Sequence, residues 1–159
     1  MNAQCQKHQT DKRIISFHTQ QILKTDYKKI VRKNDILVST TRPNRGAISI
    51  YNGNDMAIAS TGFSIIREIN PCILREYLYI VLRMPLSLKQ MSLRSSGGNY
   101  PAIIESELKK IIIPIPPLDT QKCIIEMVTK MNNKAEQLKK ESDALIEEAK
   151  EKAEKMIIG

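Results

Sequence analysis

The feature that constrains this chain most is its last quarter, residues 119–156, which contains neither Gly nor Pro. Lys, Glu, Ala, Leu, Ile and Met dominate its composition, and a Pro-rich run comes just before it. We therefore predict one long helix. At about 1.5 Å per residue it would be on the order of 55 Å long, which is more than one small globule covers by itself.

Apolar residues repeat in this helix at spacings of three and four, which is typical of a coiled-coil seam. With Val128 at heptad position a, position d holds large side chains and position a holds mostly small ones. The residues expected to pair with a partner helix are Ile124, Val128, Met131, Ala135, Leu138, Ser142, Leu145 and Ala149. We expect a homodimer, and an antiparallel one, because a parallel pair would place Lys152, another d residue, against its own copy.

Charge divides the chain into two parts with different roles. Residues 1–118 carry 17 Lys and Arg against 8 Asp and Glu, a net charge of +9, whereas residues 119–159 carry 8 against 9, a net charge of −1. A basic globule attracts polyanions, because neutralising phosphates releases their counterions. Charge alone leaves two interpretations open, nucleic-acid binding and a basic surface without a partner.

Cysteine usage and hydropathy favour a cytoplasmic location. Three cysteines (Cys5, Cys72 and Cys123) are odd in number and far apart, which argues against a disulfide framework and for a reducing compartment. No apolar run reaches membrane-spanning length, and residues 1–13 are too polar to form the core of a signal peptide. We expect no membrane partner. Since aromatic residues are 4% and Trp is absent, the core should consist mainly of Ile, Leu, Val and Met.

Short elements precede the helix, and together they predict an α+β fold with a small twisted sheet and flanking helices. Residues 1–21 lack a sustained period and are expected to be flexible, with a hint of a strand near Phe17. Alternating β-branched runs and turn residues predict a β meander from residues 36–40, 47–51, 56–60 and 63–67.

Prolines mark the helices that should follow the meander. Asn70 is the predicted N-cap of a helix over residues 73–83, with Pro71 after it. Pro85 should interrupt that helix before a second piece ends near Leu93. The remaining elements expected before the long helix are a helical turn at residues 105–109 and a strand at residues 110–115.

Catalytic motifs are scarce in this sequence. It has no Gly-rich phosphate loop, no nucleophile elbow and no Asn/Asp-Pro-Pro-aromatic signature of methyltransferases. Cys5, His8 and His18 lie in the polar N-terminal stretch without a fourth ligand, so we predict no metal site and no cofactor. Glu107 and Lys109 have the Glu-x-Lys spacing of many nucleases, but no Pro-Asp pair precedes them, and a capping or solvated role explains them better.

Two loops of the basic part are suited to contact. Residues 40–46, which we call the arginine loop, hold two arginines, an Asn and hydroxyls on a backbone stiffened by Pro43. Residues 95–100, the glycine loop, offer hydroxyl donors, two glycines that permit close backbone approach and one aromatic. Either loop alone is better explained as a connecting turn, but two such loops on one basic domain are explained equally well as contact surfaces. The DNA-contact candidates are Thr41, Arg42, Asn44, Arg45, Ser95, Ser96, Asn99 and Tyr100.

Different roles are expected for the side chains of these loops. Arg42 and Arg45 are the expected phosphate contacts, because they lie on a stiff loop in the basic part of the chain. Asn99 has the amide that pairs with adenine, and Tyr100 has a ring that packs on a sugar or a base.

Several segments in order resemble the specificity subunit of Type I restriction-modification enzymes. The most recognisable is Pro116-Pro117-Leu118 followed by Gln121 at the start of the long helix. The segments that carry the resemblance, within a match from about Lys28 to Met156, are residues 34–44, 59–63, 76–79, 95–103 and 113–121.

The resemblance implies a target recognition domain over residues 1–117, which reads part of a DNA site, and a conserved helical region over residues 118–159. In the family this helix pairs with a second helical region as an antiparallel spacer and helps to dock methyltransferase subunits. Type I subunits normally carry two recognition domains and two helical regions, whereas this chain has one of each, the first with a shortened beginning. The resemblance thus implies double-stranded DNA and a methyltransferase subunit as partners, and no catalysis by this chain.

Two alternative functions stay open from the sequence. One is a truncated or silent-cassette product that serves only as a helix-mediated assembly module without DNA binding. The other is a nuclease that uses Glu107 and Lys109. Salt-dependent binding to duplex DNA separates DNA recognition from the first alternative, and metal-dependent cleavage is required for the second.

Overall fold

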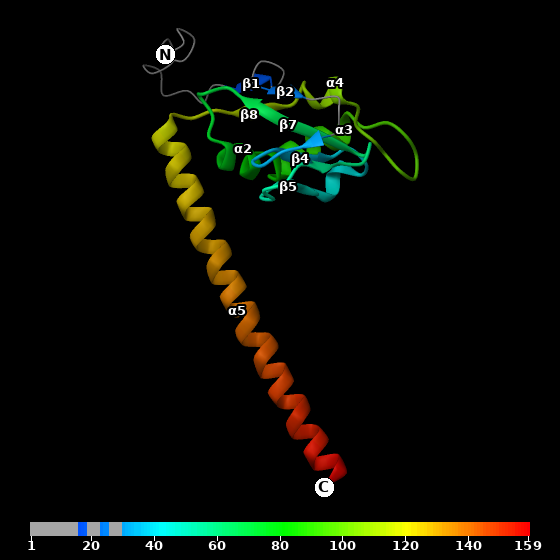
Figure 1. Cartoon of the computed structure of the whole chain (residues 1–159), viewed down its shortest axis with the longest axis vertical. Coiled ribbons are helices and arrows are strands. Elements are labelled where there is room, and N and C mark those ends of the chain that lie inside the picture. Colours follow the sequence, from blue (N-terminus) through cyan, green and yellow to red (C-terminus); the bar gives the residue numbers. More distant parts are fainter. Residues whose placement is uncertain (1–15, 19–22, 26–29) are drawn as a thin grey trace. The chain divides into compact units, whose positions relative to one another are not determined.

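The structure is a computed structural model that describes residues 16–18, 23–25 and 30–159. It divides into two compact units, unit 1 (Met1–Lys122) and unit 2 (Cys123–Gly159). In chain order the elements, labelled in Figure 1, are β1 (Ser16–His18), β2 (Leu23–Thr25), β3 (Ile30–Val31), β4 (Ile36–Ser39), η2 (Pro43–Arg45), β5 (Ile48–Ile50), β6 (Ala57–Ile58), β7 (Phe63–Ile69), α2 (Arg75–Leu82), α3 (Pro85–Leu93), α4 (Glu105–Leu108), β8 (Ile112–Pro114) and α5 (Leu118–Ile158). The predicted α+β fold with a long C-terminal helix is confirmed.

The largest sheet is antiparallel, with the strand order β2-β7-β4-β5. Ile36 of β4 lies opposite Ile50 of β5 on one side and opposite Ile66 of β7 on the other. Ile36 and Val38 are fully buried, and the alternating residues Leu37 and Ser39 are half-buried, as a strand with one face on the core requires. The predicted meander is wrong, because β4 pairs with β7 and β6 leaves this sheet for another partner.

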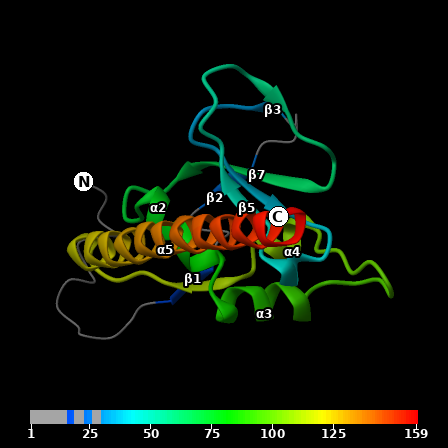
Figure 2. The ribbon, with the colours of Figure 1, turned by 90° about the horizontal axis from the view of Figure 1, so that it is seen from below.

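Two short ribbons complete the strands of unit 1. β1 pairs with β8, with Phe17 opposite Ile113, and β3 pairs with β6, with Ile30 opposite Ile58. β3 and α3 lie at opposite ends of unit 1 (Figure 2). β1 confirms the strand expected near Phe17. The rest of the segment predicted to be flexible, residues 1–21, lies outside the described residues.

A buried ion pair orders the chain where β4 begins. Asp35 is 1% exposed and accepts two hydrogen bonds from Arg67 of β7, from Nε at 3.0 Å and from a terminal guanidinium nitrogen at 2.8 Å. The backbone N–H of Arg32 donates to the same carboxylate at 2.7 Å. A carboxylate desolvated to this degree is tolerable only when it is paired and hydrogen-bonded, and Asp35 meets both conditions.

The helices of unit 1 cover the sheet with one apolar face. α2 contacts β5, β8 and α3. Its inward residues repeat at helical spacing and are Tyr77, Leu78, Val81 and Leu82. Pro85 occupies the first turn of α3, where its missing N–H costs nothing, so the predicted interruption is confirmed.

The predicted N-cap at Asn70 is wrong. Leu74 is the N-cap of α2, and its side chain makes no capping hydrogen bond. The Asn70 side-chain oxygen instead accepts a hydrogen bond from the backbone N–H of Cys72 at 3.0 Å, which closes a turn before the helix. Asn competes in this way because its short side chain reaches backbone groups two residues on.

The buried core is aliphatic, as the composition predicts. Among the described residues, Tyr77 is the one aromatic side chain in it. Its hydroxyl donates to the Pro114 carbonyl at 3.0 Å, and burial raises the pKa of this phenol. The cysteines differ from expectation, since Cys72 is disulfide-bonded while Cys123 is free and exposed. The wide spacing of the cysteines does not predict this bond.

The long helix α5 spans 41 residues, which confirms the prediction over residues 119–156. Glu136 pairs with Lys140, and Glu148 pairs with Lys152, each one turn apart. Exposed pairs of this kind add a few tenths of a kcal/mol each, roughly 0.3–0.5, to an isolated helix. Among the described residues, no helix combines the length and the apolar character that crossing a membrane demands.

The first turn of α5 belongs to unit 1 and is held there by Gln121, which is fully buried. Its side-chain nitrogen donates to the carbonyls of Cys72 and Pro116, both at 2.8 Å. Its side-chain oxygen accepts from the backbone N–H of Leu74 at 2.9 Å. The Gln121 side-chain amide thus joins three segments: the Pro-rich run before α5, the chain before α2 and the first turn of α5. These contacts explain why a Gln follows Leu118 by three residues.

Gln121→Leu should destabilise unit 1, because it removes the side-chain partner of three partly buried backbone groups. An unsatisfied buried group costs about 1–3 kcal/mol, and we expect a total loss on the order of 3 kcal/mol. Urea unfolding followed by near-UV circular dichroism of the tyrosines measures this, since all five lie in residues 1–122.

Gln137→Leu is the matched control for this substitution. Gln137 is exposed on α5, where it donates to Glu141. Its replacement should change the unfolding free energy of unit 1 by less than about 0.5 kcal/mol. Equal losses in the two variants would show that the buried amide does not stabilise the unit.

Candidate nucleic-acid interface

Backbone hydrogen bonds bring the arginine loop and the glycine loop together. After β4 the Thr40 carbonyl accepts from the N–H of Ile103 at 2.9 Å, and the N–H of Arg42 donates to the Pro101 carbonyl at 2.8 Å. Thr41 forms an antiparallel bridge with Ala102 between them. The chain beyond β4 therefore pairs directly with the end of the glycine loop, although the two loops are distant in the sequence.

The arginine loop has an unusual backbone at its centre. Arg42 has φ 49° and ψ 54°, in the left-handed region that non-Gly residues rarely adopt. The short helix η2 follows, closed by N–H donation from Arg45 to the Arg42 carbonyl and from Gly46 to the Pro43 carbonyl, both at 3.0 Å. Pro43 is buried under this turn, which leaves Asn44 and Arg45 exposed to a partner.

The side chains of the two loops also meet. The Arg42 guanidinium carbon lies 4.3 Å from the centroid of the Tyr100 ring, within the range of a cation–π contact. The same guanidinium donates to the Asn99 carbonyl at 3.2 Å, across 57 residues of sequence. Three of the predicted contact residues, Arg42, Asn99 and Tyr100, thus form one cluster.

The glycine loop is anchored at both ends and open at its tip. The Ser95 hydroxyl donates to the Met91 carbonyl at 2.8 Å, so it already has an internal partner. Ser96 pairs with Ala102 through two backbone hydrogen bonds of 3.0 and 2.8 Å. Gly97 has φ +103°, which only Gly adopts readily. Figures 1 and 2 show the tip reaching beyond the sheet and helices of unit 1.

Six of the eight predicted contact residues are exposed, namely Thr41, Asn44, Arg45, Ser96, Asn99 and Tyr100, and the remaining two, Arg42 and Ser95, are half-buried. Sequence reasoning missed the backbone of residues 101–103, which joins the loops. Its only signal was that Pro101, Ala102 and Ile103 belong to the segments that carry the family resemblance.

Ion pairs close the base of the glycine loop. Arg94, at the end of α3, lies 3.4 Å from Glu107 of α4, and Lys110 donates to the same carboxylate. The hydrogen bond from Lys110 lowers the pKa of Glu107, and Arg94 adds to the effect. Lys109 pairs instead with Glu105 at 2.8 Å. Since Glu107 and Lys109 serve different ion pairs, their geometry gives no support to a nuclease site.

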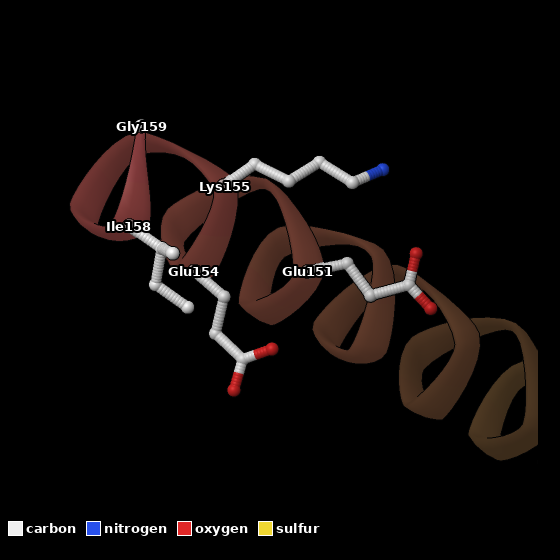
Figure 3. Close-up of a pocket in the computed structure, with 5 residues that line it drawn as sticks. All are labelled: Glu151, Glu154, Lys155, Ile158 and Gly159. Atoms are coloured by element: carbon white, nitrogen blue, oxygen red, sulfur yellow. The ribbon is translucent and has the colours of Figure 1, made fainter.

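No metal centre is evident in the part of the chain that the structure describes, where no three His, Cys, Asp or Glu side chains gather. The weak ligand set of the sequence, Cys5, His8 and His18, lies outside the described side chains. Figure 3 shows a hollow at the end of α5 lined by Glu151, Glu154, Lys155, Ile158 and Gly159. These residues come from one helix, which has no opposite wall to enclose a ligand, so we assign no site there.

The predicted seam of α5 is largely exposed within unit 2. Leu138 is 51% and Leu145 is 66% exposed. Met131 and the small a residues from Ala135 on are also exposed, while Ile124 and Val128 are half-buried. Exposed Leu side chains repeated at heptad spacing are the pattern of a helix that awaits a second helix.

Helix α3 supports the arginine loop, because η2 packs against it. A methyl group added at Gly46 would lie 3.2 Å from a terminal carbon of Leu88, and the backbone there has φ +65°. Gly46 therefore combines a left-handed backbone with a close approach, and both disfavour a side chain.

Gly46→Ala should destabilise unit 1 by about 1–2 kcal/mol, since an L side chain in the left-handed region costs that much before any contact with Leu88. Gly98→Ala is the matched control, because a methyl group at Gly98 meets nothing within 4 Å. Urea midpoints of the two variants decide the question. Equal urea midpoints in the two variants would mean that the η2 turn accommodates the added methyl group without a loss of stability.

Comparison with known proteins identifies relatives of this arrangement. A family model described as the Type I restriction modification DNA specificity domain matches residues 2–148. The specificity subunit of the Type I restriction enzyme HindI from Haemophilus influenzae is 30% identical over 112 residues, which cover 69% of this chain and 24% of that protein.

Two solved structures share the fold. The HsdS subunit from Thermoanaerobacter tengcongensis superposes with a TM-score of 0.68 at 18% identity, covering 82% of this chain and 44% of that one. The S subunit of a Type I restriction-modification system from M. genitalium has a TM-score of 0.61 at 14% identity, covering 83% and 43%. The chain thus spans about a quarter of the curated relative and less than half of each solved subunit.

Proposed function

Because this chain belongs to the family of Type I restriction-modification DNA specificity domains, we propose that it recognises a sequence in double-stranded DNA and directs a methyltransferase, with its restriction subunits, to that site. The observation that carries this proposal is the meeting of the arginine loop and the glycine loop on basic unit 1. Together they present exposed amides, hydroxyls, an arginine and a tyrosine on one surface. The chain itself contributes recognition and not catalysis.

The chemistry of the joined loops suits a base-reading surface. Arg45 offers a guanidinium for a phosphate, and the exposed amides of Asn44 and Asn99 match the donor and acceptor edge of adenine. Tyr100 is 69% exposed and presents its ring to a sugar or a base. The other candidates, Thr41 and Ser96, carry exposed hydroxyls, whereas Ser95 contributes through the anchor of its loop.

Two protein partners accompany DNA in this proposal. The recognition domain comprises residues 1–117, and the helical region of residues 118–159 pairs with a second copy of the chain and docks a methyltransferase subunit. The exposed heptad seam of α5 supports a helical partner. Since genomic DNA is the target, the proposal places the chain in the cytoplasm and assigns it no cofactor or metal of its own.

Co-expression with the methyltransferase subunit of the same system tests the whole proposal. A retained complex that methylates genomic DNA at a new specific site is the expected result. A chain that never associates, or a complex with unchanged methylation sites, would contradict it and leave the assembly-module alternative.

Arg45→Ala should weaken binding of duplex DNA and make the slope of log affinity against log salt less steep by about 0.9, the loss of one phosphate contact. Fluorescence anisotropy over a series of salt concentrations measures this. Lys130→Ala removes an exposed cation from α5 and serves as the control, with an unchanged slope. The assignment of Arg45 fails if both variants keep the slope of the unmodified chain.

Leu138→Glu combined with Leu145→Glu should split the homodimer. Each chain would then have to bury two carboxylates, at a cost of several kcal/mol, roughly the range for unpaired buried charge. Sedimentation equilibrium at about tens of micromolar, a concentration suited to a weak interface, reports the change from dimer to monomer.

Gln137→Glu with Ala144→Glu is the matched control for charge, because it adds the same two carboxylates at outward heptad positions. This variant should remain dimeric. An unmodified chain that sediments as a monomer would contradict self-pairing and leave the seam to another subunit.

A further inference from the structure

We propose that Arg42 is a positioning residue that holds the tip of the glycine loop in its DNA-reading conformation, and that Arg45 alone provides the phosphate contact of the arginine loop. This inference rests on the proposed DNA recognition and deepens it. It revises the expectation from the sequence, in which the two arginines have the same role.

The backbone of Arg42 is held in a costly conformation. With φ 49° it occupies the left-handed region, which a non-Gly residue keeps only when its surroundings determine it. The hydrogen bond from its N–H to the Pro101 carbonyl, at 2.8 Å, supplies that restraint. Arg42 is thereby fixed directly beside the chain that leaves the glycine loop.

The guanidinium of Arg42 is engaged in two different ways at the tip of the glycine loop. Its central carbon lies over the ring of Tyr100, 4.3 Å from the ring centroid, and one of its nitrogens donates to the Asn99 carbonyl at 3.2 Å. A planar group with donors at its edge does both at once, whereas the ammonium of a Lys carries the same charge but has neither the plane nor the fork.

The tip needs such a restraint because its own sequence gives it little. Gly97 and Gly98 have no Cβ, and a methyl group added at Gly98 would meet open space. Glycine loses more conformational entropy than any other residue when the chain becomes ordered. A tip that is not ordered in the free protein would lose this entropy on binding DNA, so its affinity for DNA would be lower. The contacts of Arg42 reduce this loss before DNA arrives.

Arg45 differs from Arg42 in each of these respects. It lies in the last turn of η2 and is exposed. Among the described residues, its side chain has no ion pair or ring contact that would compete with a phosphate. The two arginines of the arginine loop therefore differ in their contacts. Arg42 contacts the glycine loop, whereas Arg45 is exposed to solvent.

Arg42→Lys is the decisive variant, since it keeps the charge and removes the planar guanidinium that contacts both Tyr100 and Asn99. In the full-length protein without DNA, amide hydrogen exchange at residues 97–100 should become faster by roughly three- to tenfold, the size of a lost cation–π contact. Affinity for a duplex that carries the site methylated in the co-expression test should fall by about the same factor, with the salt slope unchanged.

Arg83→Lys provides the matched control. Arg83 lies over the ring of Tyr79, 5.0 Å from its centroid, at the end of α2, so it loses the same kind of contact outside the glycine loop. Exchange at residues 97–100 and DNA affinity should both stay at their unmodified values. Tyr100→Leu should speed exchange at residues 97–100 as Arg42→Lys does, whereas Tyr100→Phe, which keeps a ring, should leave exchange slow.

The outcomes separate this inference from the proposed function. Unchanged exchange in Arg42→Lys would overturn the positioning role, whatever DNA binding shows. An Arg42→Ala variant whose salt slope is less steep by about 0.9 would overturn it too, because Arg42 would then be a phosphate contact. If the unmodified protein binds no duplex, DNA recognition fails, and the exchange data still decide whether Arg42 orders the loop.

Discussion

The structure of unit 1 depends on the pairing of the chain beyond β4 with two distant segments. Thr40 donates to the Gly62 carbonyl at 2.8 Å on one side and accepts from Ile103 at 2.9 Å on the other. Because hydrogen bonds hold this strand end on both sides, its backbone groups have partners and the direction of the chain is determined. The arginine loop therefore leaves the sheet beside the glycine loop, and the proposed interface follows from main-chain hydrogen bonds before any side chain contributes.

Side-chain amides complete the backbone pairing elsewhere in the unit. Gln90 of α3 both donates to and accepts from the backbone of Ile112, each at 2.9 Å, as a neighbouring strand would. Gln121 does the same for the chain ends around Leu74 and Pro116. No buried side-chain nitrogen or oxygen lacks a partner in the part of the chain that the structure describes. A small aliphatic core with few aromatics is stable with this many buried polar groups because each of them is satisfied.

The two units differ in charge and exposed surface, and the proposed function divides between them accordingly. Unit 1 is basic and presents joined loops with polar tips, which suits a polyanion whose edges carry hydrogen-bonding groups. The part of α5 in unit 2 combines near-neutral charge with an exposed heptad seam, which suits another helix.

The sequence by itself determined the features that depend on neighbours along the chain. The helix over residues 119–156, the break at Pro85 and the aliphatic core were all predictable, because propensity, the missing N–H of proline and composition are local properties. The tertiary structure decided the strand order, the capping of α2 by Leu74 instead of Asn70, and the contact of Arg42 with Tyr100. The strand order and the contact of Arg42 with Tyr100 depend on which distant segments meet, and several pairings satisfy the same backbone hydrogen bonds until packing of the whole unit selects one.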